Sequence, residues 1–231
     1  MLRIRGVAAG LHSQAMRTSG RVLAISVAAS LTFLVVRPLT AGDWPVIFEV
    51  LSILLLAVPG FRISAMLGSA LVICSVGDFL LGVQRLGSLD RDALFLLGLA
   101  SFLIAHLVYI ALFRKYRAMG WRKPSPLRVL GVLVIVAALG TVLGVLRPSL
   151  GSMLIPVVVY SLVLCVMGIS AMLADLGTPL AGFGALLFIA SDAILAISKF
   201  RGPVRGNVQL IWITYYAAQV LILRGVEHRR E

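Results

Sequence analysis

Eight mainly apolar runs, each about as long as one membrane-spanning helix, limit what this chain can fold into. Such a run has to be helical inside a bilayer, because lipid offers no hydrogen-bond partners to the backbone. The composition agrees, since 60% of the 231 residues are apolar, 13% are charged and the mean hydropathy is +1.04. We therefore predict an all-α, polytopic transmembrane helix bundle. Its spans lie at residues 22–38, 44–60, 64–84, 92–113, 127–146, 150–173, 179–199 and 207–225.

The second run is less regular than the others. Pro45, Glu49 and Pro59 leave it only a short uninterrupted apolar stretch, so seven and nine spans are the alternatives to eight. No soluble domain is expected, because the longest non-membrane segments are the N-terminal tail and the basic loop RKYRAMGWRKPSP. We expect a basic cytoplasmic tail at 1–21, a single transmembrane domain at 22–225 and a cytoplasmic C-terminal tail at 226–231.

The basic residues are distributed unevenly between the two sets of loops. With eight spans, the tails and the loops on their side carry 14 Lys and Arg, whereas the opposite loops carry 7. The positive-inside rule then places both termini in the cytoplasm. A net charge of +12 would suggest nucleic acid in a soluble chain, but here the basic residues meet anionic lipid headgroups. We expect membrane lipids as partners and no nucleic acid.

Two pairs of segments resemble each other across the chain. VAASLTFLVVRPL at 27–39 is similar to VAALGTVLGVLRPSL at 136–150, which places Arg37 opposite Arg147. CSVGDFLLG at 74–82 is similar to FIASDAILA at 188–196, which places Asp78 opposite Asp192. The offsets of 110 and 114 positions nearly agree, which predicts a parallel duplication of four helices. Chance similarity between Leu-, Val- and Ala-rich segments is the alternative.

Few ionisable side chains lie inside the predicted spans, where each is costly to bury and by default marks a functional path. Asp78 and Asp192 would lie at similar depth, because each follows the midpoint of its run by a few residues. A structural contact could be made by Ser, Thr or Asn at lower cost, so we expect both aspartates in a working site. The intramembrane polar set comprises Glu49, Asp78, His106 and Asp192, with Tyr109, Tyr160, Thr214, Tyr215, Tyr216 and Gln219.

Other members of this set have structural explanations as well. A lone His in a membrane helix often packs with its nitrogens bonded to a neighbouring backbone or hydroxyl group, and this applies to His106. Trp212, Tyr216 and Gln219 recur at i, i+4 and i+7, a stripe that also suits ordinary core or interfacial aromatic residues. Glu49 lies near a predicted helix end, from which its side chain could reach the headgroups.

A pair of buried carboxyl groups suits acid and base chemistry. Desolvation and a second nearby carboxylate both disfavour the charged form, so such a pair holds one shared proton and titrates as a unit. One group can then act as a general acid while the other stabilises a cation or activates water. The sequence has no nucleophile elbow, no HExxH, no phosphate-binding glycine loop and no Cys/His cluster, and Cys74 and Cys165 both lie in apolar runs. Acid–base hydrolysis, proton-coupled transport and structural polarity remain.

Four segments together resemble the YhhN family of membrane proteins, the lysoplasmalogenase-like family. They are VGDFLLG, FLLGLASFLIAHLVYIALF, GALLFIASDAILAISKF and ITYYAAQVLI. The combination of GD, AH-x-x-Y, SD and YY-x-x-Q is specific although each motif is weak alone, and the resemblance covers roughly 30–222. Arg37-Pro38 stands where the family tends to show Lys-Pro after its first span, and Arg37 could meet a phosphate group of the substrate.

The resemblance implies hydrolysis of the vinyl-ether bond of lysoplasmalogens, giving a fatty aldehyde and a glycerophospho-headgroup, with no metal or organic cofactor. A vinyl ether is cleaved when its β-carbon is protonated and water captures the resulting cation, which suits a carboxylic acid beside a carboxylate. We therefore predict that Asp78 and Asp192 are catalytic, in an undecided order, and that His106 relays protons. A lysophospholipid substrate and a bacterial plasma membrane are expected. The predicted substrate- or water-orienting residues are Tyr109, Tyr215, Tyr216, Gln219 and Arg37, with Glu49 as an additional candidate.

Two other functions fit the same residues. A transporter of small amphiphiles could use Asp78 and Asp192 as proton sites, although no matched pair of Gly- or Pro-broken helices is seen in the two halves. A non-catalytic lipid-binding protein could use the polar set only to hold its helices together. Both alternatives predict that the purified protein consumes no substrate.

Overall fold

The computed structural model describes residues 20–83, 86, 89–117, 125–202 and 204–229. Nearly all of the predicted tail at 1–21, the middle of the basic loop and the last two residues lie outside the described residues. Helices dominate the described part, which contains no β-strand. After a first helix at residues 20–36 come α2 (Val46–Ile63), α3 (Ala65–Gly82), α4 (Arg91–Lys115), α5 (Pro126–Leu146), α6 (Leu154–Leu173), α7 (Leu180–Phe200) and α8 (Asn207–His228).

The expected polytopic helical bundle is confirmed, and the predicted spans end within about four residues of the observed helices. By length and composition, seven of the described helices, from the first helix to α7, are apolar and long enough to cross a membrane. The chain is therefore an integral membrane protein. Helix α8 is equally long but carries more polar side chains, and several of them, such as Trp212, Tyr215 and Gln219, are buried inside the bundle.

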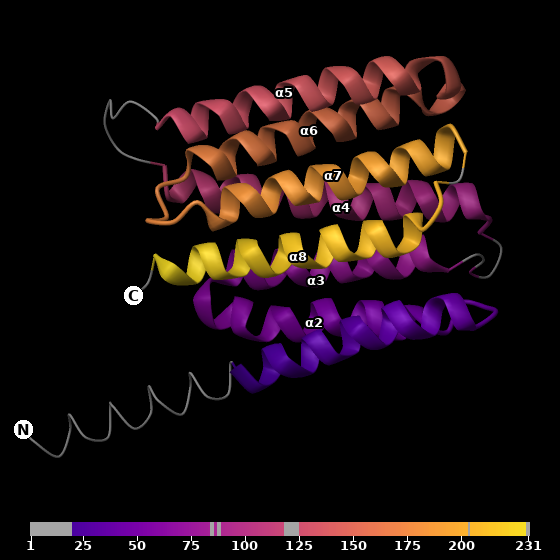
Figure 1. Ribbon diagram of the computed structural model, residues 1–231, viewed down its shortest axis with the longest axis horizontal. Coiled ribbons are helices and arrows are strands. Elements are labelled where there is room, and N and C mark those ends of the chain that lie inside the picture. The colour runs from indigo at the N-terminus through magenta and orange to yellow at the C-terminus, as the bar shows by residue number, and fades with distance from the viewer. Residues whose placement is uncertain (1–19, 84–85, 87–88, 118–124, 203, 230–231) are drawn as a thin grey trace, which may run out of the picture.

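The helices run side by side along one axis (Figure 1). Helices α5 and α6 form one edge of the view, and α2 with the first helix forms the other. In the middle, α7 is drawn in front of α4 and α8 in front of α3. The start of the first helix lies at the same end of the bundle as the end of α8. This arrangement follows because the described part of the chain has eight long helices, an even number. The side of the membrane that both termini face stays a prediction.

Close helix contacts hold α7 against α8. A Cβ atom at Gly184 would lie 2.8 Å from the carbonyl oxygen of Ala218, and one at Gly225 would lie 2.6 Å from the backbone nitrogen of Ala181. Small residues let helix backbones approach in lipid, where packing and hydrogen bonds rather than water exclusion hold helices together. Ser191 adds a hydrogen bond of 3.1 Å from its hydroxyl group to the carbonyl oxygen of Ile211. The start of α8 is thereby fixed against the middle of α7.

Two Arg-Pro pairs end helices in the same way. The first helix closes in a 3-10 turn at Arg37–Leu39, and α5 closes in another at Arg147–Ser149. Proline has no N–H group to donate to the carbonyl oxygen four residues earlier, which weakens the helical hydrogen-bond ladder at both ends. This local match agrees with the repeat noted in the sequence, and the duplication itself stays a prediction.

Candidate active site

A polar cavity of about 210 Å³ lies between α2, α3, α7 and α8. It sits near the end of the bundle opposite the start of the first helix and the end of α8, because its lining comes from the end of α3 and the starts of α2, α4 and α8. Ionisable and polar side chains come together there from distant parts of the sequence. The polar lining consists of Arg37, Glu49, Asp78, Arg91, Ser191, Asp192, Asn207, Trp212 and Tyr215.

Asp78 on α3 is held by a tyrosine on α8. The hydroxyl group of Tyr215 donates a hydrogen bond of 2.9 Å to Oδ2 of Asp78, whose side chain is buried. A buried carboxyl group without such a partner would bear the full cost of desolvation. Helix α3 approaches α4 closely just before Asp78, since a Cβ at Gly77 would lie 2.6 Å from the ring of Phe102. The carboxyl group is thus positioned from two sides.

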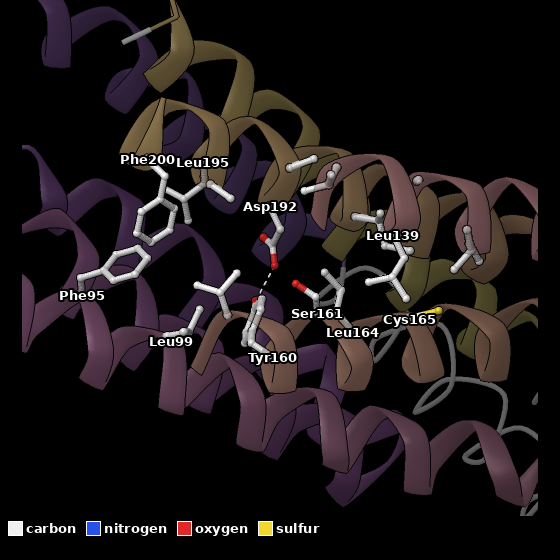
Figure 2. A pocket seen from close by; sticks show the side chains of 17 residues that line it. Phe95, Leu99, Leu139, Tyr160, Ser161, Leu164, Cys165, Asp192, Leu195 and Phe200 are labelled. Carbon is white, nitrogen blue, oxygen red and sulfur yellow. Dashed lines mark hydrogen bonds between the residues drawn. The ribbon is translucent and has the colours of Figure 1, made fainter. Parts of the chain in front are cut away.

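Asp192 on α7 is held in a similar way by a different helix. The hydroxyl group of Tyr160 on α6 donates a hydrogen bond to Oδ2 of Asp192, as Figure 2 shows. Asp192 is only half-buried, because it also borders a second, mainly apolar cleft. The two aspartates therefore share one arrangement, in which a tyrosine occupies one carboxyl oxygen.

A third carboxyl group and an arginine complete the charged lining. Glu49 near the start of α2 interacts electrostatically with Asp78 and with Arg37. Arg37 also donates a hydrogen bond of 3.2 Å to the carbonyl oxygen of Gly42, which ties it to the connection between the first helix and α2. The structure thus brings Glu49 to the cavity, where a role only at the headgroups had been an alternative.

The other predicted site residues do not line this cavity. His106 is fully buried against the rings of Tyr160 and Phe188, with centroid distances of 5.4 and 4.9 Å. Within the described part of the chain, neither nitrogen of His106 has a hydrogen-bond partner. Tyr109 donates a hydrogen bond of 2.6 Å to Oε1 of Gln219 deeper in the core.

Tyr216 lies on a different face of α8 from its neighbour Tyr215. Its hydroxyl group shares a hydrogen bond of 2.7 Å with the hydroxyl group of Ser26 on the first helix. Both tyrosines were predicted to orient substrate or water, because the sequence does not indicate which of two adjacent positions faces the site. Only Tyr215 reaches the cavity.

Several lining residues were absent from the predicted site. Arg91, which begins α4, is exposed at the cavity, and Asn207 begins α8. Nothing in their local sequence distinguishes them from other polar residues at helix ends. Tyr160, which lines the second cleft, belonged to the intramembrane polar set of the sequence, but its pairing with Asp192 depends on how α6 meets α7. The described residues contain no group of three or more His, Cys, Asp or Glu side chains that could hold a metal ion.

Known proteins resemble this chain over most of its length. A lysoplasmalogenase of Mycobacterium bovis is 36% identical over 168 residues, covering 70% of this chain and 60% of that protein. Lysoplasmalogenase TMEM86B of Homo sapiens is 37% identical over 165 residues, covering 71% and 64%. The chain thus spans less than two thirds of the length of these two relatives. Lysoplasmalogenase TMEM86B of Rattus norvegicus is 32% identical over 205 residues, covering 85% and 79%.

No solved structure matches this chain. The model of one family, the YhhN family, matches residues 44–226, which include every helix from α2 to α7 and most of α8. The match also contains both aspartates of the polar cavity and the two tyrosines that hold them. This chain is a member of the YhhN family.

Proposed function

We propose that this protein is a membrane-embedded hydrolase that cleaves the vinyl-ether bond of lysoplasmalogens. The observation that carries the proposal is the placement of Asp78 and Asp192 on one cavity inside the bundle, each with a tyrosine on one carboxyl oxygen. The similarity to relatives named lysoplasmalogenases supports the same activity.

The arrangement suits the chemistry of a vinyl ether. Cleavage needs a proton donor at the β-carbon and a negative charge near the oxocarbenium ion that follows, and general acids and bases must lie within hydrogen-bond reach. Tyr160 and Tyr215 each bind Oδ2, and among the described residues no hydrogen bond engages Oδ1 of Asp192 or of Asp78, which leaves these atoms to the substrate and to water. Asp78 also interacts electrostatically with Asp192, so one of the two carboxyl groups can stay protonated while the other is ionised.

The polar end of the substrate would meet the charged lining of the cavity. Arg37 and Arg91 lie there, and the planar guanidinium group binds phosphate oxygens in a bidentate manner. We assign the phosphate to these two arginines and the glycerol to the polar cavity. His106 lines neither the cavity nor the apolar cleft. It packs against the ring of Tyr160, whose hydroxyl group binds Asp192, so any influence of His106 on Asp192 would pass through Tyr160.

Orientation and location follow from the distribution of charge. Most Lys and Arg residues belong to the tails and to the loops on the side where the first helix starts and α8 ends, so we place that side in the cytoplasm. The polar cavity then opens on the opposite side of the membrane. We assign the protein to a bacterial plasma membrane, which the match to a mycobacterial relative supports.

The test is aldehyde release from lysoplasmenylethanolamine by the purified protein in detergent. Asp78→Asn and Asp192→Asn should each lower the rate by about 10²- to 10⁴-fold, the usual contribution of general acid–base catalysis. Asp175→Asn is the matched control, because Asp175 pairs with Arg128 at the other end of the bundle. No aldehyde from the native protein would disprove the hydrolase, and uptake of substrate into sealed vesicles would instead favour transport.

A further inference from the structure

A second cleft lies between α4, α5, α6 and α7, and we call it the chain cleft. Each of the three helices α5, α6 and α7 contributes one face to it, with positions recurring every three or four residues. The lining is almost entirely apolar, and Figure 2 shows Tyr160, Ser161 and Asp192 as its polar group. Helix α5 contributes Ile135, Ala138, Leu139 and Val142.

The chain cleft and the polar cavity meet at α7. Asp192 and Leu195 line both of them, whereas Asp78 lines only the polar cavity. An amphiphile lying across the two would therefore pass Asp192 at the boundary between its apolar and polar parts. Asp78 would face only the polar part.

The chain cleft fits hydrocarbon, and its size limits how much hydrocarbon. Its volume of about 60 Å³ has room for a few methylene groups, so the rest of a long chain must extend past α5 into the bilayer. Helix α5 is the outermost helix on this edge, and few of its side chains are buried. The cationic Arg37 and Arg91 at the polar cavity complement a phosphate at the other end of the same molecule.

We infer that the chain cleft holds the first carbons of the substrate's alkenyl chain, so that Asp192 protonates the β-carbon and Asp78 acts on water. This inference rests on the proposed function. In a vinyl ether the β-carbon belongs to the chain side, while the α-carbon and the ether oxygen belong to the glycerol side. The only one of the two aspartates that borders both regions is Asp192.

The reaction balances with these two residues. The π electrons of the C=C bond take the proton of Asp192, which becomes a carboxylate, and the α-carbon becomes an oxocarbenium ion. Water adds to the α-carbon as Asp78 accepts its proton, giving a hemiacetal. Asp192 then accepts the proton of the hemiacetal hydroxyl group, and the bond from the α-carbon to the glycerol oxygen breaks. Asp78 protonates that oxygen. Aldehyde and alcohol leave, and both aspartates regain their starting states.

Photolabelling tests this assignment without requiring hydrolysis. The probe is a lysophosphoethanolamine with a saturated ether chain and a diazirine at the second chain carbon, because alkyl diazirines label carboxyl groups preferentially. It is irradiated with the purified full-length protein, and labelled peptides are mapped by mass spectrometry. We expect labelling of Asp192 and of residues in the chain cleft, with little labelling of Asp78.

Two neighbouring alanines on α5 provide a matched pair of variants. Ala138 lines the chain cleft, whereas Ala137 is exposed on the outside of the helix. Ala138→Phe should reduce labelling of Asp192 by about tenfold, equivalent to about 1.4 kcal/mol of binding, and Ala137→Phe should leave it unchanged. Labelling of Asp78 in place of Asp192, equal effects of the two variants, or no labelling above that of Ala138→Phe would overturn the inference.

The photolabelling experiment and the aldehyde-release assay can fail independently of each other. Labelling of Asp192 by the probe, together with no aldehyde from a vinyl-ether substrate, would leave the chain cleft as a lipid site and remove the hydrolase. Aldehyde release together with labelling elsewhere would leave the hydrolase and remove the chain cleft.

Discussion

Tyr215 on α8 donates a hydrogen bond of 2.9 Å to Asp78 on α3, and so joins two side chains 137 positions apart at the inner wall of the polar cavity. Helix α8, which contributes this contact, is the least apolar of the helices α2 to α8. Its polarity is therefore directed inward, toward the candidate site.

Removal of the Tyr215 hydroxyl group should impair catalysis more than folding. Tyr215→Phe takes away the donor to the Asp78 carboxyl group, and a hydrogen bond to a charged group contributes about 1.5–3 kcal/mol, or roughly 10- to 150-fold in rate. The rate of aldehyde release and the unfolding temperature measure the two effects. Tyr216→Phe, whose hydroxyl group meets Ser26 instead, is the control and should retain near-native activity. Equal losses in both variants would contradict the assignment of Tyr215 to the site.

The charge of Arg91 should matter for substrate binding more than for the chemical step. Arg91→Ala is expected to raise KM by about tenfold with kcat nearly unchanged, which is the result when an interaction equal in the ground and transition states is lost. Arg201→Ala is the control, because Arg201 is an exposed arginine that donates to Ser149 and does not line the cavity. A change in kcat alone would argue against a headgroup role for Arg91.

Reaction in D₂O should place one deuterium atom on the second carbon of the product aldehyde. The proposed step transfers a solvent-exchangeable proton from a carboxyl group to the β-carbon, which becomes that position. Immediate reduction of the aldehyde to the alcohol, followed by mass spectrometry, measures the label. Unlabelled aldehyde incubated with the protein in D₂O controls for exchange by enolisation. An undeuterated product would exclude protonation at the β-carbon.

A side chain at Gly184 should loosen the contact between α7 and α8. Its Cβ would lie 2.8 Å from the carbonyl oxygen of Ala218, and overpacking of this kind costs about 1–3 kcal/mol. We expect Gly184→Leu to lower the unfolding temperature in detergent and, with it, the activity. Gly140→Leu is the control, because nothing lies within 4 Å of a Cβ at Gly140. An unchanged unfolding temperature for Gly184→Leu would show that the two helices do not depend on this close approach.

The sequence by itself determined the class of fold and the limits of the helices to within a few residues, because a bilayer requires long apolar runs and offers no hydrogen-bond partner to the backbone. It left the number of spans open between seven and nine. It also indicated Asp78 and Asp192, since an acid inside an apolar run is costly and its depth can be counted along the helix. The structure places both on one cavity, while their catalytic roles remain predictions.

The tertiary structure alone decided which polar side chains meet. Successive residues on a helix point about 100° apart, so Tyr215 reaches Asp78 while Tyr216 reaches Ser26. It also decided that Asp192 borders the chain cleft and Asp78 does not, because this depends on how α5, α6 and α7 pack together. Burial cost depends on depth, which sequence spacing reveals, whereas contact depends on the rotation and neighbours of each helix, which only the packed bundle sets.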